Sequence, residues 1–585
     1  MRIIRGQRTY ADLPLLLTSH NYKVFNKHQH FLREYAKKQA ANTREFVENT
    51  KRRPSEQMKK SISSYLRNCP KSALSTLQAG IQLGERGRNG LKGSFRPGRG
   101  AGLQAGPGLF GQFLKRLVDS RALHAFVLMA VLLLAAYTAF FRLGFEDWHT
   151  DEPIYSKAGL AYIQEGDFSI NQEHPFLAKY VLGVAQVVSG SSETEAVRMP
   201  AATASLLTGL VLFAFGRRVA GYWAGVLALA LWTISPLTLT FGRDATIEIF
   251  LIFFSTLALY LGWRWTESGS WWFAGFAGVA LGLATASKLT GILFLPAIVL
   301  VGLLKIGLSR RLIFQGMLIS LAAVATVLAT YAPAWSEAPS AIRYMFEFQS
   351  QHNAEGHRQS VNGEVYKFPP WWAHLWWQWG LYGTLASLSL GVAVVIALLR
   401  RRALEIYLLA AALVPFLVLS FYVQVRLKHY FGVWQPPLIL LLAIVGGELA
   451  QQGVATGRRG VARGILVVLL LAPFLYLGAE AVQTVSETQT GPNAAVAEHL
   501  KDTGYDRGLI LTQGGRIKEN LPDEARVLDK LEDAQGEEIE VVILNSDSWR
   551  PRHAATRDYL ETNRDQFEHS YSVGDMEVYT RKPDG

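Results

Sequence analysis

The sequence predicts an all-α polytopic membrane protein of about eleven transmembrane helices, with a small C-terminal α/β domain outside the membrane. Half of the 585 residues are hydrophobic and only 18% are charged, whereas soluble domains usually carry about a quarter charged residues. The apolar residues also gather in runs long enough to cross the ~30 Å hydrocarbon core of a bilayer. A single cysteine, Cys69, excludes a disulfide framework and any cysteine-based metal cluster.

Residues 1–116 form a strongly basic segment, with 23 Lys and Arg against 6 Asp and Glu, whereas the rest of the chain is mildly acidic. Its Gly-rich stretch at 84–108 cannot bury a core, so we expect a largely disordered tail. A basic segment before the first span is typical of the cytoplasmic side. Attraction to the membrane surface accounts for this charge, and we predict no nucleic-acid partner.

Apolar segments of spanning length follow the tail, and we expect each to be a transmembrane helix. They are residues 121–141, 198–216, 219–241, 245–263, 271–287, 289–304, 312–332, 379–399, 404–422, 432–449 and 464–482. With the tail in the cytoplasm, the basic clusters between these segments all fall on the cytoplasmic side, as the positive-inside rule requires. Segment 174–190 is too short for a comfortable span and carries Lys179, so we expect it to lie in the interface.

This topology divides the chain into a cytoplasmic tail (1–116), a transmembrane domain (117–482) and an extracytoplasmic domain (483–585). The transmembrane domain has long outer loops at 142–197 and 333–378. In the last domain the apolar stretches GLILT, EVVIL and MEVYT alternate with the helix-like AAVAEHLKDTG and ATRDYLETN. This pattern predicts a small α/β unit. We expect the protein to be an integral, multi-pass protein of the plasma membrane.

Two groups of acidic residues lie on the predicted outer side. Asp151 and Glu152 precede Pro153 where a helix is expected to begin, so they either cap that helix or serve chemistry at the membrane surface. Asp244 and Glu248 lie where the fourth span starts. Glu248 is about one helical turn into an apolar run, and ionisable groups at such a depth are functional candidates.

Basic and histidine side chains gather on the same predicted side, close to the ends of the spans. Each alone is compatible with an ordinary interfacial residue whose charged head reaches the headgroups. Together, beside the acids, they predict a phosphate site. The candidate substrate-binding and phosphate-binding residues are His174, Lys179, Arg243, Asp244, Lys288, Arg426, Lys428 and His429.

Four short motifs occur in order along residues 122–450. They are the Asp151–Glu152 pair, HPFLAK at 174–179, RDATIE at 243–248 and SKLTG at 287–291. With these motifs the chain resembles a C-superfamily (GT-C) glycosyltransferase of the protein O-mannosyltransferase and aminoarabinose-transferase group. It departs from the family pattern at Phe176, where a second proline is usual, and at Glu248, where Asp is frequent.

The resemblance implies a membrane enzyme that moves a sugar, hexosyl, mannosyl or related, from a polyprenyl-phosphate-linked donor to an acceptor hydroxyl at the outer face, with inversion. The departing lipid phosphate is a weak base, so the reaction needs no general acid. It needs a base for the incoming hydroxyl, which we predict to be Asp151, and cations that stabilise the leaving phosphate. Glu152 and Glu248 are the other catalytic candidates. Besides membrane lipids, the expected partners are this donor and an acceptor that is a protein, a glycan or a lipid.

Two further readings remain open at this stage. His352 and His357, with Glu355 between them, suggest a divalent metal, but their spacing is not that of two ligands on one helical face and no third ligand is marked. We therefore predict no metal site and no firm cofactor. A multi-span transporter or a lipid or glycan flippase is the alternative function, and it would place charges or broken helices near the bilayer midplane.

Overall fold

The computed structural model describes residues 120–149, 151–453, 458–513, 517–522, 524–545 and 552–582. All of them belong to one unit of the chain, Ala105–Gly585. The predicted tail, 1–116, lies outside the described residues.

Within the described residues, nine helical segments are long and apolar enough to cross a membrane. They are α5 (Arg121–Phe140), α8 (Thr194–Ala220), α11 (Ile247–Ser268), η1–α13 (Leu289–Ile306), α14 (Arg310–Thr330), α16 (Ala373–Arg400), α17–η3 (Ala403–Tyr422), η4–α18 (Lys428–Ala450) and α19 (Arg458–Glu487). Two shorter apolar helices, α9 (Tyr222–Thr233) and α12 (Trp271–Ser287), complete the predicted series. The expected polytopic helical fold is therefore confirmed, with each predicted apolar segment helical and in order.

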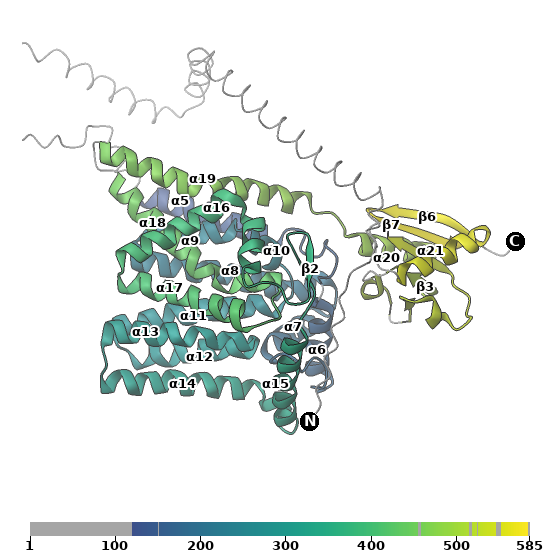
Figure 1. The fold of residues 1–585 in the computed structure, drawn as a ribbon, viewed down its shortest axis with the longest axis horizontal. Helices are drawn as coiled ribbons and strands as arrows, with labels where there is room; N and C mark the ends of the chain where they lie inside the picture. Colours follow the sequence, from purple (N-terminus) through teal and green to yellow (C-terminus); the bar gives the residue numbers. More distant parts are fainter. Residues whose placement is uncertain are drawn as a thin grey trace, which may run out of the picture. The chain divides into compact units, whose positions relative to one another are not determined.

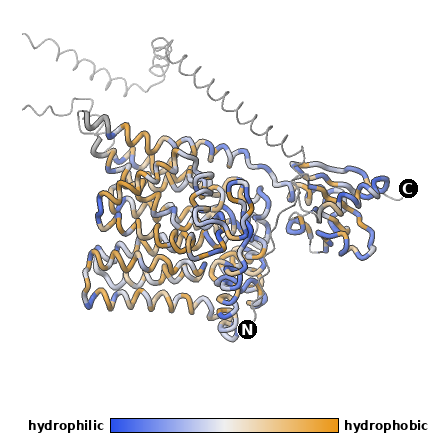
Figure 2. The backbone as a smooth tube through the Cα atoms, viewed as in Figure 1, coloured by the Kyte–Doolittle hydropathy of each residue, from blue (hydrophilic) through white to orange (hydrophobic). Residues whose placement is uncertain are grey.

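Hydropathy follows the same division of the chain. Figure 2 shows hydrophobic residues along the long helices and hydrophilic residues in the C-terminal domain and at many helix ends. Many apolar side chains on these helices remain exposed, including Phe126, Leu321 and Val395. An exposed apolar surface of this extent is suited to contact with lipid.

Three helices run across one end of the bundle instead of along it (Figure 1). They are α6 (Glu152–Gln164), α7 (Leu177–Ser189) and α15 (Ala338–Glu355). With 13 residues, α7 is too short to cross a bilayer, as expected for segment 174–190. A Cβ atom on Gly159 of α6 would collide with the backbone of Lys179 and Gly183 in α7. The two helices therefore approach closely only because glycines lie at the crossing.

Successive long helices pack antiparallel, so the loops between them lie alternately at the two ends of the helical bundle. At the end opposite α6 and α7, Arg218 pairs with Glu267 at 2.9 Å, and Arg400 pairs with Glu448 at 2.6 Å. The predicted cytoplasmic clusters thus share one end of the bundle. The predicted outer acids, Asp151 among them, lie at the other end.

The predicted outer loop at 333–378 contains α15 and a short antiparallel hairpin of β1 (Gln359–Val361) and β2 (Glu364–Tyr366). Trp377 at the start of α16 donates a hydrogen bond to the carbonyl of Ser360 at 3.1 Å. This contact holds the hairpin against the helical bundle.

The C-terminal domain contains a five-stranded mixed sheet of order β4-β3-β5-β7-β6. Strands β3 (Leu509–Thr512), β4 (Arg526–Leu528) and β5 (Val541–Asn545) are parallel, while β6 (Phe567–Val573) and β7 (Met576–Arg581) run antiparallel. Helices α20 (Pro492–Thr503) and α21 (Arg552–Thr562) pack on opposite faces, because Leu500 clusters with Ile510 and Leu560 clusters with Leu511. The predicted α/β unit is confirmed. The edge strands β4 and β6 were not foreseen.

Candidate active site

Asp151 occupies the N-cap position of α6, but its side chain makes no capping hydrogen bond. Its carboxylate is half-buried and has no hydrogen-bond partner within the described part of the chain. Its charge acts on Tyr155, Lys288 and Tyr430. The carboxylate is thus available to a ligand and is not used to cap the helix.

Glu152, its neighbour, is fully buried and forms a bidentate ion pair with Arg198 of α8, at 2.9 and 2.7 Å. The backbone N–H groups of Ala245 and His149 also donate to this carboxylate. Burial by itself would raise the pKa of Glu152, but Arg198 and the two N–H groups hold it below its usual value. Glu152 therefore remains ionised inside the fold.

Arg198 completes this arrangement with its remaining donors. It binds the carbonyls of Leu143 at 3.2 Å, Glu146 at 2.9 Å and Asp147 at 2.6 Å. All five N–H groups of the guanidinium are thus satisfied. The pair therefore fastens the loop after α5 to α8 and to the segment before α11.

Arg243 precedes α11 and binds main-chain carbonyls. Its guanidinium donates to the carbonyls of Thr138, Phe141 and Arg142 at 2.8 to 3.1 Å. These carbonyls belong to the end of α5, where a helix leaves acceptors unsatisfied. Asp244 beside it is buried, and burial together with the charge of Glu152 raises its pKa well above the usual range.

Lys179 and Arg426 likewise bind the main chain. Lys179 is fully buried and donates to the carbonyls of Asn171 and His174, and burial lowers its pKa to about 7. Arg426 donates to the carbonyl of Ser420 at 2.8 Å and to that of Pro369. Lys428, in contrast, is exposed.

Glu248, in the first turn of α11, is the centre of a buried charged cluster. Lys288 and His429 both contact its Oε1 atom, His429 through Nε2 at 3.0 Å. The ammonium group of Lys288 also lies 4.3 Å from the centre of the Tyr430 ring. Residues from α11, from the α12–η1 junction and from η4 (Lys428–Trp434) thus converge.

The SKLTG segment explains how Lys288 reaches this cluster. Lys288 leaves α12 in an extended conformation, and the N–H of Gly291 returns to its carbonyl at 2.9 Å. A Cβ atom on Gly291 would collide with the backbone of Ala284 and Thr285. Glycine is therefore required for the tight turn that directs Lys288 toward Glu248.

His174 and Tyr155 lie beside the same cluster. Their rings are 6.1 Å apart, and the charges of Lys288 and Glu248 act on His174. Burial, followed by the positive charges of Lys288 and Lys179, lowers the pKa of His174 well below its usual value, so the imidazole is neutral. Sequence reasoning missed Tyr155, although it lies four residues after Asp151 on one helical face.

The histidines of the loop before α16 do not form a metal site in the part of the chain that the structure describes. The rings of His352 and His357 are 5.5 Å apart, and Glu355 accepts a hydrogen bond from Gln351. No group of three His, Cys, Asp or Glu among the described residues is placed to hold a metal ion.

We predict that Glu152→Gln destabilises the protein by about 3 to 5 kcal/mol, because it leaves the buried charge of Arg198 uncompensated. Thermal unfolding in detergent measures this effect, and Glu165→Gln, an exposed change just after the end of α6, is the control. The folded-state pKa of Glu152 is depressed, so its contribution is present at neutral pH and is lost as the pH falls through that value. The gap between wild type and Glu152→Gln should therefore narrow in acid, and equal stability of Glu152→Gln and the control at pH 7 would contradict the structural role.

Part of the chain that contains the charged cluster matches a known protein family. Residues 173–336 match the family model described as dolichyl-phosphate-mannose-protein mannosyltransferase, a segment that includes His174, Arg243, Glu248 and Lys288. No curated protein matches the chain.

The chain is similar to several solved structures. ArnT from Cupriavidus metallidurans bound to undecaprenyl phosphate has a TM-score of 0.54 and 14% sequence identity, over 79% of this chain and 99% of that chain. Its apo form has a TM-score of 0.54 and 15% identity, over 78% and 97%. The oligosaccharyltransferase of Archaeoglobus fulgidus has a TM-score of 0.48 and 14% identity, over 80% and 75%. The chain thus has the GT-C glycosyltransferase fold, and its resemblance to the protein O-mannosyltransferase and aminoarabinose-transferase group is confirmed.

Proposed function

We propose that this protein transfers a sugar from a polyprenyl-phosphate-linked donor to an acceptor hydroxyl, with inversion at the anomeric carbon. The observation that carries the proposal is the free carboxylate of Asp151 within electrostatic range of the Lys288–Glu248–His429 cluster. A base and a cation are the two elements that this reaction requires.

The proposed step is a single displacement. The acceptor oxygen attacks the anomeric carbon and transfers its proton to Asp151, while the bond from that carbon to the phosphate oxygen breaks. The phosphate leaves on its lipid, held by Lys288 and His429. Glu248 orients Lys288 and His429 through its Oε1 atom, and Tyr155, Tyr430 and neutral His174 border the sugar.

The geometry refines the list of phosphate-binding candidates. The guanidinium of Arg243 and the ammonium of Lys179 are directed at main-chain carbonyls, so we propose that they position loops and do not bind the donor. Arg426 is bound in the same manner. Lys428 is exposed near the cluster and remains a candidate for the headgroup.

Fold similarity supports a lipid phosphate as the donor's carrier, because ArnT was solved with undecaprenyl phosphate bound. We propose a hexose such as mannose, or a related sugar, with a protein, glycan or lipid acceptor. Mass spectrometry of intact lipids that copurify with the detergent-solubilised protein would identify the donor.

We place the site and the C-terminal domain at the outer face of the plasma membrane, because the basic loops share the opposite end of the helical bundle.

Asp151→Asn should lower kcat more than tenfold, a loss above about 1.4 kcal/mol, with donor affinity nearly unchanged. The amide retains the size of the side chain but cannot accept the proton. The measurement is donor-dependent release of polyprenyl phosphate, and Asp502→Asn, an exposed change in α20, is the matched control. If Asp151→Asn keeps more than about a tenth of wild-type kcat, Asp151 is not the base.

Lys288→Met should weaken the binding of undecaprenyl phosphate about tenfold or more, since hydrogen bonds to charged groups contribute roughly 1.5 to 3 kcal/mol. Lys501→Met on the surface of α20 should bind as wild type. The double variant Lys288→Met/Glu248→Gln removes the uncompensated carboxylate, so it should regain thermal stability without regaining affinity. Wild-type affinity in a folded Lys288→Met protein would exclude Lys288 from the phosphate site.

Sidedness can be tested in a Cys69→Ser background. Glu561→Cys on α21 should react with a membrane-impermeant maleimide added to intact cells. Leu308→Cys, in the exposed loop between α13 and α14, should react only after permeabilisation. The reverse order of labelling would place the site on the cytoplasmic side.

A further inference from the structure

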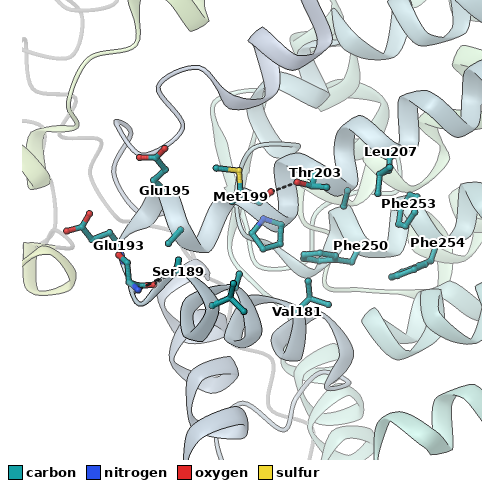
Figure 3. A pocket seen from close by; sticks show the side chains of 16 residues that line it. Val181, Ser189, Glu193, Glu195, Met199, Thr203, Leu207, Phe250, Phe253 and Phe254 are labelled. Atoms are coloured by element: carbon teal, nitrogen blue, oxygen red, sulfur yellow. Dashed lines mark hydrogen bonds between the residues drawn. The ribbon is translucent and has the colours of Figure 1, made fainter. Parts of the chain in front are cut away.

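An open groove of about 730 Å³ lies between α7, α8 and α11. Figure 3 shows Phe253, Phe254 and Leu207 toward one end of it and the carboxylates of Glu193 and Glu195 toward the other. Its walls are otherwise almost entirely apolar. The groove therefore has a long hydrophobic body and one acidic end.

The groove is distinct from the candidate active site, although the same helices build both. In α11, Glu248 faces the charged cluster and Phe250 lines the groove. Two residues turn an α-helix by roughly 200°, so these side chains point to opposite faces. In α8, likewise, Arg198 binds Glu152 inside the bundle while Met199 lines the groove.

Position and surface chemistry indicate a lipid as the occupant. Helices α8 and α11 are long enough to span a bilayer, so the apolar body of the groove is at the depth of acyl chains. Phe250, Phe253 and Phe254 provide a large contact area for such a chain.

The acidic end selects the headgroup. Glu193 and Glu195 are exposed, and no basic residue is found among the described residues that line the groove. Carboxylates accept hydrogen bonds from an ammonium group and disfavour a purely anionic headgroup.

We propose that this groove binds a phospholipid whose headgroup ends in a primary ammonium, of the phosphatidylethanolamine class. The ammonium lies between Glu193 and Glu195, and one acyl chain extends over the three phenylalanines. This site is separate from the donor site and takes a zwitterionic lipid whose ammonium meets the carboxylates, whereas the donor's lipid phosphate is purely anionic.

Native mass spectrometry of the delipidated full-length protein, titrated with dioleoyl phosphatidylethanolamine or dioleoyl phosphatidylglycerol, tests the proposal. The wild type should bind the ethanolamine lipid more tightly. Glu193→Gln/Glu195→Gln should reduce that preference about fivefold, the scale expected for two exposed ion pairs. The control Glu337→Gln/Glu347→Gln, exposed on α15, should retain it.

Leu207→Trp, which fills the apolar body, should weaken the binding of both lipids in a protein of unchanged melting temperature. Equal affinity of the wild type for the two lipids would overturn the proposal, as would an unchanged preference in the Glu193→Gln/Glu195→Gln variant. Stoichiometric displacement of the ethanolamine lipid by undecaprenyl phosphate would instead assign the groove to the donor's chain.

Discussion

The buried ion pair between Glu152 and Arg198 is the interaction on which the geometry of the candidate active site depends. Burying two charges is costly unless every donor and acceptor is satisfied, and here all five N–H groups of Arg198 are used. Because Glu152 also accepts from Ala245, the pair joins three segments that are distant in sequence. Asp151 is held at the edge of this arrangement, with its carboxylate free.

The same loop connects the candidate active site with the C-terminal domain. The carboxylate of Asp147 accepts hydrogen bonds from the backbone N–H groups of Asn493 and Ala494 at 3.1 Å, and so caps α20 from outside its own domain. Arg142 donates to the carbonyl of Thr488 at 2.7 Å. A movement of the C-terminal domain would therefore displace the loop that contains Asp147, four residues before Asp151.

Most of the outer cations serve the backbone. Irregular segments near a membrane surface carry carbonyl groups that neither a helix nor lipid can satisfy. Arg243, Lys179 and Arg426 bind such carbonyls, whereas Lys288 pairs with Glu248. The number of basic residues near the span ends is thus a poor measure of how many could bind a phosphate.

The sequence by itself determined the helical membrane fold, the strands β3, β5 and β7, and the order of the four motifs, because these depend on local hydropathy and spacing. We predicted Asp151 and not Glu152 as the base, but the local sequence does not show which of these two adjacent side chains becomes buried. Glu152 is the buried residue because it pairs with Arg198, 46 residues further along the chain. In the same way, Arg243 binds the carbonyls at the end of α5, and the turn at Gly291 directs Lys288 toward Glu248. The edge strands β4 and β6 also depended on partners distant in the chain. Only tertiary structure decides which charge is buried and which stays free, because desolvation and pairing are set by neighbours that the local sequence does not contain.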